Sequence, residues 1–366
     1  MQDGLEARNV TTLSPSGSTA TGAPRGRPTM VDVAKHAHVS LKTVSRVVND
    51  EPGVRPETAD RVRESIRALG FRRNDGARQL RRGRTASIGL IVEDLGNPFY
   101  SALTGAVERV ARRHEHLLLS ASAEGSAERE RSIVEAFLDR RVDGLIIVPA
   151  EAEHAWLTPE VGDRTPVVFV DRPASGIAAD AVLIDNRGGV RSAVEHLVAH
   201  GHRRLGFLGD DASFWTARER RAGFEASLHA LGAADGGNLA MGPYALDELI
   251  ELLRAWTKGP EAITAVVTGN NRVTAQLLHA VRHLDTPLSL VGFDDFEYAD
   301  LLDPPVTVIS QNPDALGEQA AHALFSRLDA LAGSESEPPA VRQIVLPTRL
   351  IVRGSTSQDD SDGSSS

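Results

Sequence analysis

The spacing of apolar side chains changes character along the chain. From residue 29 to residue 69, apolar residues recur every three or four positions in short pieces, which is the spacing of small amphipathic helices. From residue 88 onward, short runs rich in Val, Ile and Leu alternate with longer stretches of helical spacing. Apolar strands separated by helices indicate a parallel sheet covered on both faces. Roughly 250 residues of this alternation exceed one doubly wound unit and predict two lobes in tandem.

The predicted elements of the second part alternate in type. Strands are expected at 87–92, 116–121, 144–148, 167–170, 204–209, 265–268 and 288–293. Helices are expected between them at 100–114, 127–140, 189–200, 217–231, 247–256 and 272–283.

The first part predicts two short helices joined by a three-residue turn. Thr29 precedes the first helix and Asp32 follows three positions on, the pattern of a capping residue with an acidic partner. Ser40 caps a second helix over 41–48, which turns Val44, Val47 and Val48 inward. This arrangement is typical of a helix-turn-helix, whose second helix enters the major groove of DNA.

A third helix completes this small unit. Pro56 suits its first position and Gly70 ends it. Ala59, Val62, Ile66 and Leu69 share one stripe and are expected to cover the core. The sequence therefore predicts an all-helical head in front of an α/β body.

Charge separates the head from the body. Residues 25–84 carry fifteen Lys or Arg against seven Asp or Glu, a net charge of +8, whereas the whole chain carries −10. A basic segment on an acidic body is typical of a nucleic-acid-binding module, although a solvated basic face is the simpler alternative.

Composition excludes several classes of protein. The chain has no cysteine, and therefore no disulfide framework, thiol nucleophile or thiolate metal site. It also lacks an apolar run of membrane-spanning length and an apolar signal core, so we expect a cytoplasmic protein that does not bind membranes. The polar ends, residues 1–27 and 354–366, are expected to be a disordered arm and a disordered tail.

The sequence resembles the LacI/GalR family of bacterial transcription regulators. The resemblance rests on TMVDVAKHAHVSLKTVSRVVND, VRPETADRVRESIRALGF and TASIGLIVEDLGNPFY, and continues through VFVDR, ERRAGF and VGFDD. It covers roughly residues 28–353. It implies a helix-turn-helix domain at 28–73, a hinge helix and linker at 74–85, and a two-lobed, type I periplasmic-binding-protein-like domain at 86–353 for ligand binding and dimerisation.

The resemblance also implies which side chains contact DNA. Leu41, Lys42 and Arg46 would read base edges, with Arg46 donating two hydrogen bonds to a guanine. Thr43 and Ser45 would contact phosphates. Asn49, which follows the same helix, is also among the expected DNA-contacting residues. Packing between helices is the alternative role of Leu41.

The hinge carries its own expected contacts. By the resemblance, Leu80 from each subunit would wedge into a central base step of the minor groove, with Arg78 beside it. The sequence departs from the family pattern at His38, where the turn usually has glycine, at Arg73, where the family usually has proline, and at Gly76, a glycine inside the hinge helix.

The body is expected to bind a ligand between its lobes, at the carboxyl ends of the strands. Lobe one would comprise 86–184 and 311–332, and lobe two 185–310 and 341–353. Aromatic, carboxylate, amide and guanidinium groups in these loops suit a hydroxyl-rich ligand. The candidate ligand-binding residues are Phe99, Tyr100, Asp171, Arg172, Trp215, Arg220, Asn270 and Asp294. The alternatives are helix capping for the two aspartates, a surface ion pair for Arg172 and a core position for Trp215.

An enzyme is not indicated. No nucleophile elbow, phosphate-binding loop or dinucleotide fingerprint is present, and no catalytic residue, cofactor or metal site is predicted. We therefore expect a homodimeric repressor that binds a near-palindromic operator under the control of a small carbohydrate. Two alternatives remain: a sugar-binding component of a transporter, and a regulator controlled by a partner protein.

Overall fold

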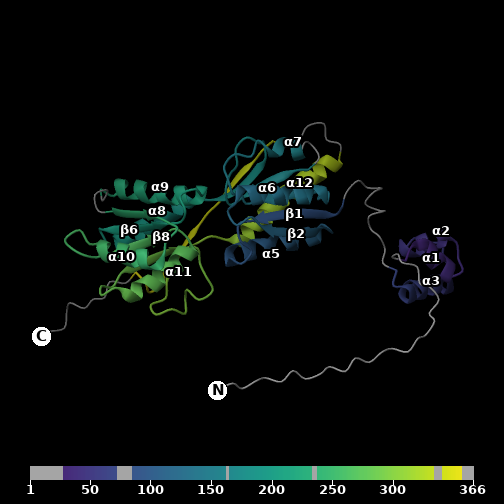
Figure 1. Ribbon diagram of the computed structural model, residues 1–366, viewed down its shortest axis with the longest axis horizontal. Coiled ribbons are helices and arrows are strands. Elements are labelled where there is room, and N and C mark those ends of the chain that lie inside the picture. The colour runs from purple at the N-terminus through teal and green to yellow at the C-terminus, as the bar shows by residue number, and fades with distance from the viewer. Residues whose placement is uncertain (1–27, 72–84, 162–164, 233–236, 334–339, 357–366) are drawn as a thin grey trace, which may run out of the picture. The chain divides into compact units, whose positions relative to one another are not determined.

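The computed structural model describes residues 28–71, 85–161, 165–232, 237–333 and 340–356. The chain divides into two compact units between residues 81 and 82. In the part that the structure describes, the first unit contains helices and no strand, and the second contains two sheets flanked by helices (Figure 1). The predicted arm and nearly all of the hinge and tail lie outside the described residues.

Three helices form the small unit around one apolar centre. They are α1 (Met30–His36), α2 (Leu41–Val48) and α3 (Pro56–Leu69). Val33, Val44 and Val62 are fully buried where the helices meet. The three predicted helices are thus confirmed, including the end of α3 at Gly70, whose φ of 62° ends the helix in a left-handed turn.

Hydrogen bonds at their amino termini fix where α1 and α2 begin. Thr29 Oγ1 accepts from Asp32 N at 3.3 Å, and Asp32 Oδ2 accepts from Thr29 N at 2.9 Å. Ser40 Oγ accepts from Thr43 N at 3.1 Å. These caps satisfy backbone N–H groups in the first turn and so stabilise the observed start of each helix.

The turn between α1 and α2 contains a strained position. His38 has a φ of 52° and an exposed side chain. We expect His38→Gly to stabilise the small unit by up to about 1 kcal/mol, because glycine adopts the left-handed region without a steric cost. Slower hydrogen exchange of the α1 and α2 amides would show the gain. Faster exchange would mean that the imidazole contributes more than the strain costs.

Each lobe of the large unit is built on a six-stranded sheet. In lobe one the order is β11-β5-β4-β3-β1-β2, with all neighbours parallel. In lobe two the order is β12-β10-β9-β8-β6-β7, with β12 antiparallel to β10. The strands of lobe one are β1 (Ser87–Val92), β2 (Leu117–Ser122), β3 (Gly144–Ile147), β4 (Val167–Val170), β5 (Asp180–Ile184) and β11 (Gln343–Leu346). Those of lobe two are β6 (Leu205–Gly209), β7 (Gly237–Met241), β8 (Ala265–Thr268), β9 (Ser289–Phe293), β10 (Thr307–Ser310) and β12 (Arg349–Ile351).

Helices cover both faces of each sheet. In lobe one, α5 (Pro98–Arg113) and α12 (Pro313–Ala332) pack on one face, and α6 (Ala127–Asp139) and α7 (Leu157–Val161) on the other. In lobe two, α8 (Asn186–Ala199) and α9 (Trp215–Ala230) pack on one face, and α10 (Leu246–Trp256) and α11 (Asn271–Ala280) on the other, followed by a short turn of 3-10 helix (Val281–His283). The predicted α/β class is confirmed, and each strand and helix predicted after residue 86 is present.

The two lobes repeat one topology, and the chain crosses between them three times. Strands β1 to β5 occupy the same sheet positions as β6 to β10. The chain passes to lobe two after β5, returns after β10, and crosses again between β11 and β12. The predicted placement of 341–353 wholly in lobe two is therefore wrong, because 343–346 pair in parallel with β5 in lobe one.

Candidate functional site

One face of α2 is buried and the other is available for contact. Val44 and Val47 are buried, and Val48 is only half-buried. Leu41 is 49% exposed, which contradicts the alternative that it packs between helices. The structure therefore places Leu41, with the predicted DNA-contacting residues of the same helix, outside the core. Those residues are Lys42, Thr43, Ser45, Arg46 and Asn49.

Short hydrogen bonds organise the polar side chains of this face. Ser40 Oγ lies 2.8 Å from Thr43 Oγ1, and Asn49 Nδ2 donates to Ser45 Oγ at 3.3 Å. Side chains held in this way lose less conformational entropy when they bind. Arg78 and Leu80 of the predicted hinge lie outside the described residues.

A cavity of about 40 Å³ lies between the two lobes. It is lined by the segments that follow β1, β4, β6, β8, β9 and β10, including the first turns of α5, α9 and α11, as the rule for parallel sheets requires. The structure brings together seven of the eight candidate ligand-binding residues. The lining residues are Glu93, Asn97, Phe99, Tyr100, Asp171, Arg172, Asp210, Thr216, Arg220, Asn270, Asn271, Arg272, Asp294 and Gln311.

Lobe one contributes a buried network centred on Arg172. Its guanidinium pairs with Glu93, donates to Pro149 O at 3.1 Å and lies 3.4 Å from Tyr100 Oη. Tyr100 in turn donates to Asp171 Oδ2 at 3.3 Å. Arg172 is therefore an internal member of the site, and the surface ion pair considered for it is excluded by its burial.

Lobe two contributes a second buried guanidinium. Arg220 Nε donates to Asn186 Oδ1 at 2.7 Å, and Nη1 donates to Gly269 O at 2.6 Å. Its guanidinium carbon lies 3.8 Å from the centre of the Phe293 ring, within the range of a cation–π contact. Asp294 Oδ2 lies 3.9 Å away from Nη1. These contacts fix the guanidinium plane at the floor of the cavity.

Asp171 and Asp294 occupy equivalent positions in the repeated topology. Each follows the fourth strand of its lobe directly, and both have a φ of 69°. A left-handed aspartate at two matching positions is a strained feature of the kind that clusters at binding sites. Loss of hydration raises the pKa of both carboxyls, and the positive charge of Arg220 partly offsets the effect on each.

The burial of Asp294 leads to a pH-dependent prediction. Since its pKa is raised in the folded state, its ionisation destabilises the fold as the pH rises above the ordinary value of 3.8. We expect Asp294→Asn to raise the free energy of unfolding at pH 8 by about 1 kcal/mol, and the gain to shrink towards pH 4. Thermal unfolding at several pH values measures this difference. A gain that did not vary with pH would contradict the assignment to charge burial.

Direct contacts between the lobes close the cavity. Arg272 of lobe two pairs with Asp94 of lobe one, and Asn271 Nδ2 donates to Asn97 Oδ1 at 3.0 Å. The guanidinium carbon of Arg172 lies 4.3 Å from the centre of the Phe214 ring. Trp215, the eighth candidate, does not line the cavity and packs instead against an apolar cluster of lobe one.

Several buried polar atoms around the cavity lack a hydrogen-bond partner among the described residues. Two are acceptors, Asn271 Oδ1 and Gln311 Oε1, and two are donors, Arg172 Nε and Asn186 Nδ2. Buried polar groups are normally satisfied, so an unpaired set of both kinds marks a place for a ligand. Hydroxyl groups suit it because each one donates and accepts.

Sequence reasoning missed half of the lining residues. Glu93 follows β1 and Asp210 follows β6, so the rule that located Asp171 would also have located them. Gln311 follows β10, a four-residue strand that was not predicted. The other missed residues, Asn97, Thr216, Asn271 and Arg272, carry no separate signal beyond their position in these loops.

Other kinds of site are not indicated by the described part of the chain. Its helices include none with the length and apolar composition that a bilayer crossing requires. Its His, Asp and Glu side chains form no group of three suited to a metal ion.

Comparisons with known proteins agree with this architecture. The family described as bacterial regulatory proteins, lacI family, matches residues 29–74, and the periplasmic binding protein-like domain matches residues 194–356. The HTH-type transcriptional regulator PtxS of Pseudomonas putida is 33% identical over 342 residues, covering 92% of this chain and 99% of its own length.

Two solved structures share both the fold and part of the sequence. The lac repressor dimer bound to operator and the anti-inducer ONPF is 25% identical, with a TM-score of 0.76, and the match covers 91% of this chain and all of that one. The transcriptional regulator CelR in complex with cellobiose is 26% identical, with a TM-score of 0.62, covering 90% and 100% of the two chains.

Proposed function

Because the chain belongs to the LacI family of bacterial regulatory proteins, we propose that it represses transcription as a homodimer whose operator affinity is set by a small sugar. It is a DNA-binding regulator controlled by a ligand. The observation that carries the proposal is a helix-turn-helix unit with a polar outer face on α2, joined in one chain to a two-lobed unit with a polar cavity.

The outer face of α2 supplies the proposed DNA contacts. Arg46 donates two hydrogen bonds to a guanine, Lys42 reaches a neighbouring base, and Leu41 contacts a thymine methyl. Thr43, Ser45 and Asn49 contact the backbone and fix the register. The proposed hinge at 74–85 adds Arg78 and the wedge Leu80.

The chemistry of the cavity supports a sugar as the effector. Carboxylates and guanidiniums from both lobes provide paired acceptors and donors, and the Phe99 ring offers an apolar surface beside them. One relative, CelR, is known in complex with cellobiose. We propose that Phe99, Tyr100, Asp171, Arg172, Arg220, Asn270 and Asp294 contact the effector.

The size of the cavity implies that binding moves the lobes. Ligand pockets generally enclose about 300–1,000 Å³, whereas this cavity measures about 40 Å³. The effector therefore separates the pairs that close it, Arg272 with Asp94 and Asn271 with Asn97. A ligand that favours the separated arrangement by a few kcal/mol shifts the population of the two states and, with it, operator binding.

A patch on lobe two offers a surface for self-association. Tyr298, Leu301 and Leu302 follow β9 and are exposed, with Leu301 at 74%. Exposed apolar groups gathered in this way mark interaction sites. We propose that they contribute to the homodimer and that the protein acts in the cytoplasm, with no enzymatic role.

Selection of bound duplexes from a random DNA library tests the function. We expect enrichment of a near-palindromic site, and its release by one of four probes: D-ribose, D-galactose, D-gluconate or cellobiose. Thermal shifts with the same probes report binding independently of DNA. No enriched sequence would overturn the regulator assignment; operator binding without a response to any probe would overturn the sugar assignment and favour control by a partner protein. A thermal shift with no enriched sequence would favour the transporter alternative.

A further inference from the structure

A fully buried acid–base pair lies in lobe one outside the cavity. Glu130 on α6 and His154, between β3 and α7, have no solvent-exposed surface. Glu130 Oε1 lies 2.6 Å from His154 Nε2, and Glu130 Oε2 accepts from Ala150 N at 2.6 Å. Burying a carboxylate costs several kcal/mol unless its oxygens are paired. Both oxygens of Glu130 are used to hold the same short segment.

The contacts of the His154 ring fit one tautomer of the imidazole. His154 Nδ1 is buried and has no partner, so the tautomer with its proton on Nε2 satisfies the contact with Glu130. The imidazole then donates to the carboxylate, and Ala150 N donates to its other oxygen. Glu130 is therefore the acceptor that joins α6 to two points of the segment 149–156.

This segment reaches the cavity through one carbonyl group. Pro149 O, adjacent to Ala150, accepts from Arg172 Nη1 at 3.1 Å. The segment also binds the loop that carries Arg172, since His154 N donates to Ser175 O and Ser175 N donates to Ala152 O, both at 2.8 Å. The side chain and the backbone after Arg172 are thus both anchored on residues that Glu130 holds.

We propose that Glu130 and His154 are positioning residues for effector binding. They fix the segment 149–156, and through Pro149 O they hold the Arg172 guanidinium against Glu93 and Tyr100 in the cavity. A binding group keeps its geometry when the residues behind it are locked by packing and hydrogen bonds. The inference rests on the proposed function for the role of Arg172 in effector binding, but the anchoring of Arg172 can be tested without a ligand.

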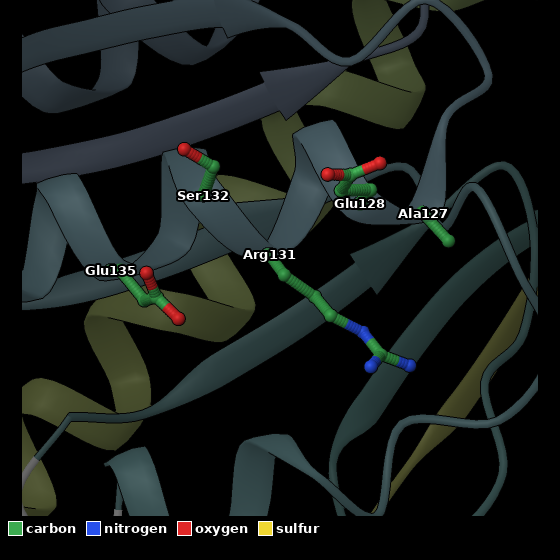
Figure 2. Close-up of a pocket in the computed structure, with 5 residues that line it drawn as sticks. All are labelled: Ala127, Glu128, Arg131, Ser132 and Glu135. Carbon is green, nitrogen blue, oxygen red and sulfur yellow. The ribbon is translucent and has the colours of Figure 1, made fainter.

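Glu135 on α6 provides a matched control. Figure 2 shows it with Glu128 beside a surface groove of about 510 Å³. Arg131, which also borders the groove, is unsuitable as a control because it pairs with Glu151 of the segment 149–156 at 2.7 Å. Glu135 is exposed on the same helix as Glu130. Glu135→Gln therefore makes the same chemical change as Glu130→Gln without touching the segment 149–156.

Hydrogen exchange and a double-mutant cycle test the proposal. We expect Glu130→Gln to speed amide exchange in 149–156 and 171–176 by about tenfold or more. We also expect it to lower the affinity for the tightest-binding of the four sugar probes by about tenfold. In an Arg172→Ala background the same substitution should lower the affinity for that probe by less than about twofold, because the effects of coupled residues are not additive. Glu135→Gln should leave both measurements unchanged.

Additive losses, or unchanged exchange at 171–176, would overturn the proposal and leave the pair a purely structural role. If Glu130→Gln does not fold, His154→Gln takes its place, because it keeps Glu130 and an amide that can donate to it. That variant should retain protection of 149–156, whereas His154→Ala should lose it; equal protection in the two would also overturn the proposal. If no probe binds the wild-type protein, the sugar assignment fails while the exchange results still decide the anchoring.

Discussion

Replacement of Arg220 by alanine is expected to weaken effector binding strongly. Its guanidinium is buried between Asn186, Gly269 O and the Phe293 ring, and its Nη1 lies 3.9 Å from Asp294 Oδ2. Removing one partner of a buried charged group costs about 2–5 kcal/mol, which corresponds to a loss of roughly 30-fold or more in affinity. Titration calorimetry with the responsive sugar probe measures the loss.

The neighbouring residue supplies the control for this experiment. Arg221 is exposed and pairs with Glu225 at 3.0 Å on the surface of the same helix. Surface pairs of this kind contribute little, so Arg221→Ala should change affinity and stability by less than about 0.5 kcal/mol. Equal affinity in the Arg220→Ala variant and the wild type would remove Arg220 from the binding site.

Arg46→Ala is expected to remove base discrimination at one position in each half of the operator. Arg46 lies on the outer side of α2, opposite the buried Val44 and Val47. Losing a bidentate contact costs about 1–3 kcal/mol for each half-site. A homodimer would therefore lose up to about 6 kcal/mol on a symmetrical operator. Binding to duplexes substituted at each position would show which base pair no longer matters.

A substitution of a basic residue on another helix distinguishes a loss of base specificity from a loss of general electrostatic attraction to DNA. Arg63 on α3 is 55% exposed at its side chain and pairs with Asp60 at 3.0 Å. Arg63→Ala removes the same charge from the small unit without touching α2, and should weaken all duplexes equally or not at all. An unchanged base preference in Arg46→Ala would assign Arg46 to the phosphate backbone instead.

Local signals in the sequence were sufficient to predict the helices of the small unit. The caps at Thr29 and Ser40 and the turn at Gly70 depend on residues a few positions apart, so the helix boundaries could be predicted and were confirmed. The same is true of the longer strands, whose apolar runs are continuous. The rule that ligands bind at the carboxyl ends of parallel strands located Asp171, Asn270 and Asp294 beside the cavity.

Features set by distant contacts could not be predicted. Strand β11 has half-exposed and exposed side chains, and its place beside β5 depends on a pairing across 162 residues between Ala181 and Gln343. Half of the buried residues of helix α12 are Gly or Ala, which weakens the amphipathic pattern that would reveal its buried face. Trp215 contacts lobe one only because the two lobes meet, a condition that no local pattern records.

The threefold crossing of the chain affects how the large unit is made during translation. A ribosome releases the polypeptide from its amino terminus, and domains synthesised earlier generally fold earlier. Lobe one begins first, yet α12 and β11 leave the ribosome only after nearly all of lobe two. Lobe one therefore cannot complete its fold until α12 has been synthesised, and until then the face that α12 covers remains exposed. A chain stalled near residue 310 would have nearly all of lobe two but an incomplete lobe one.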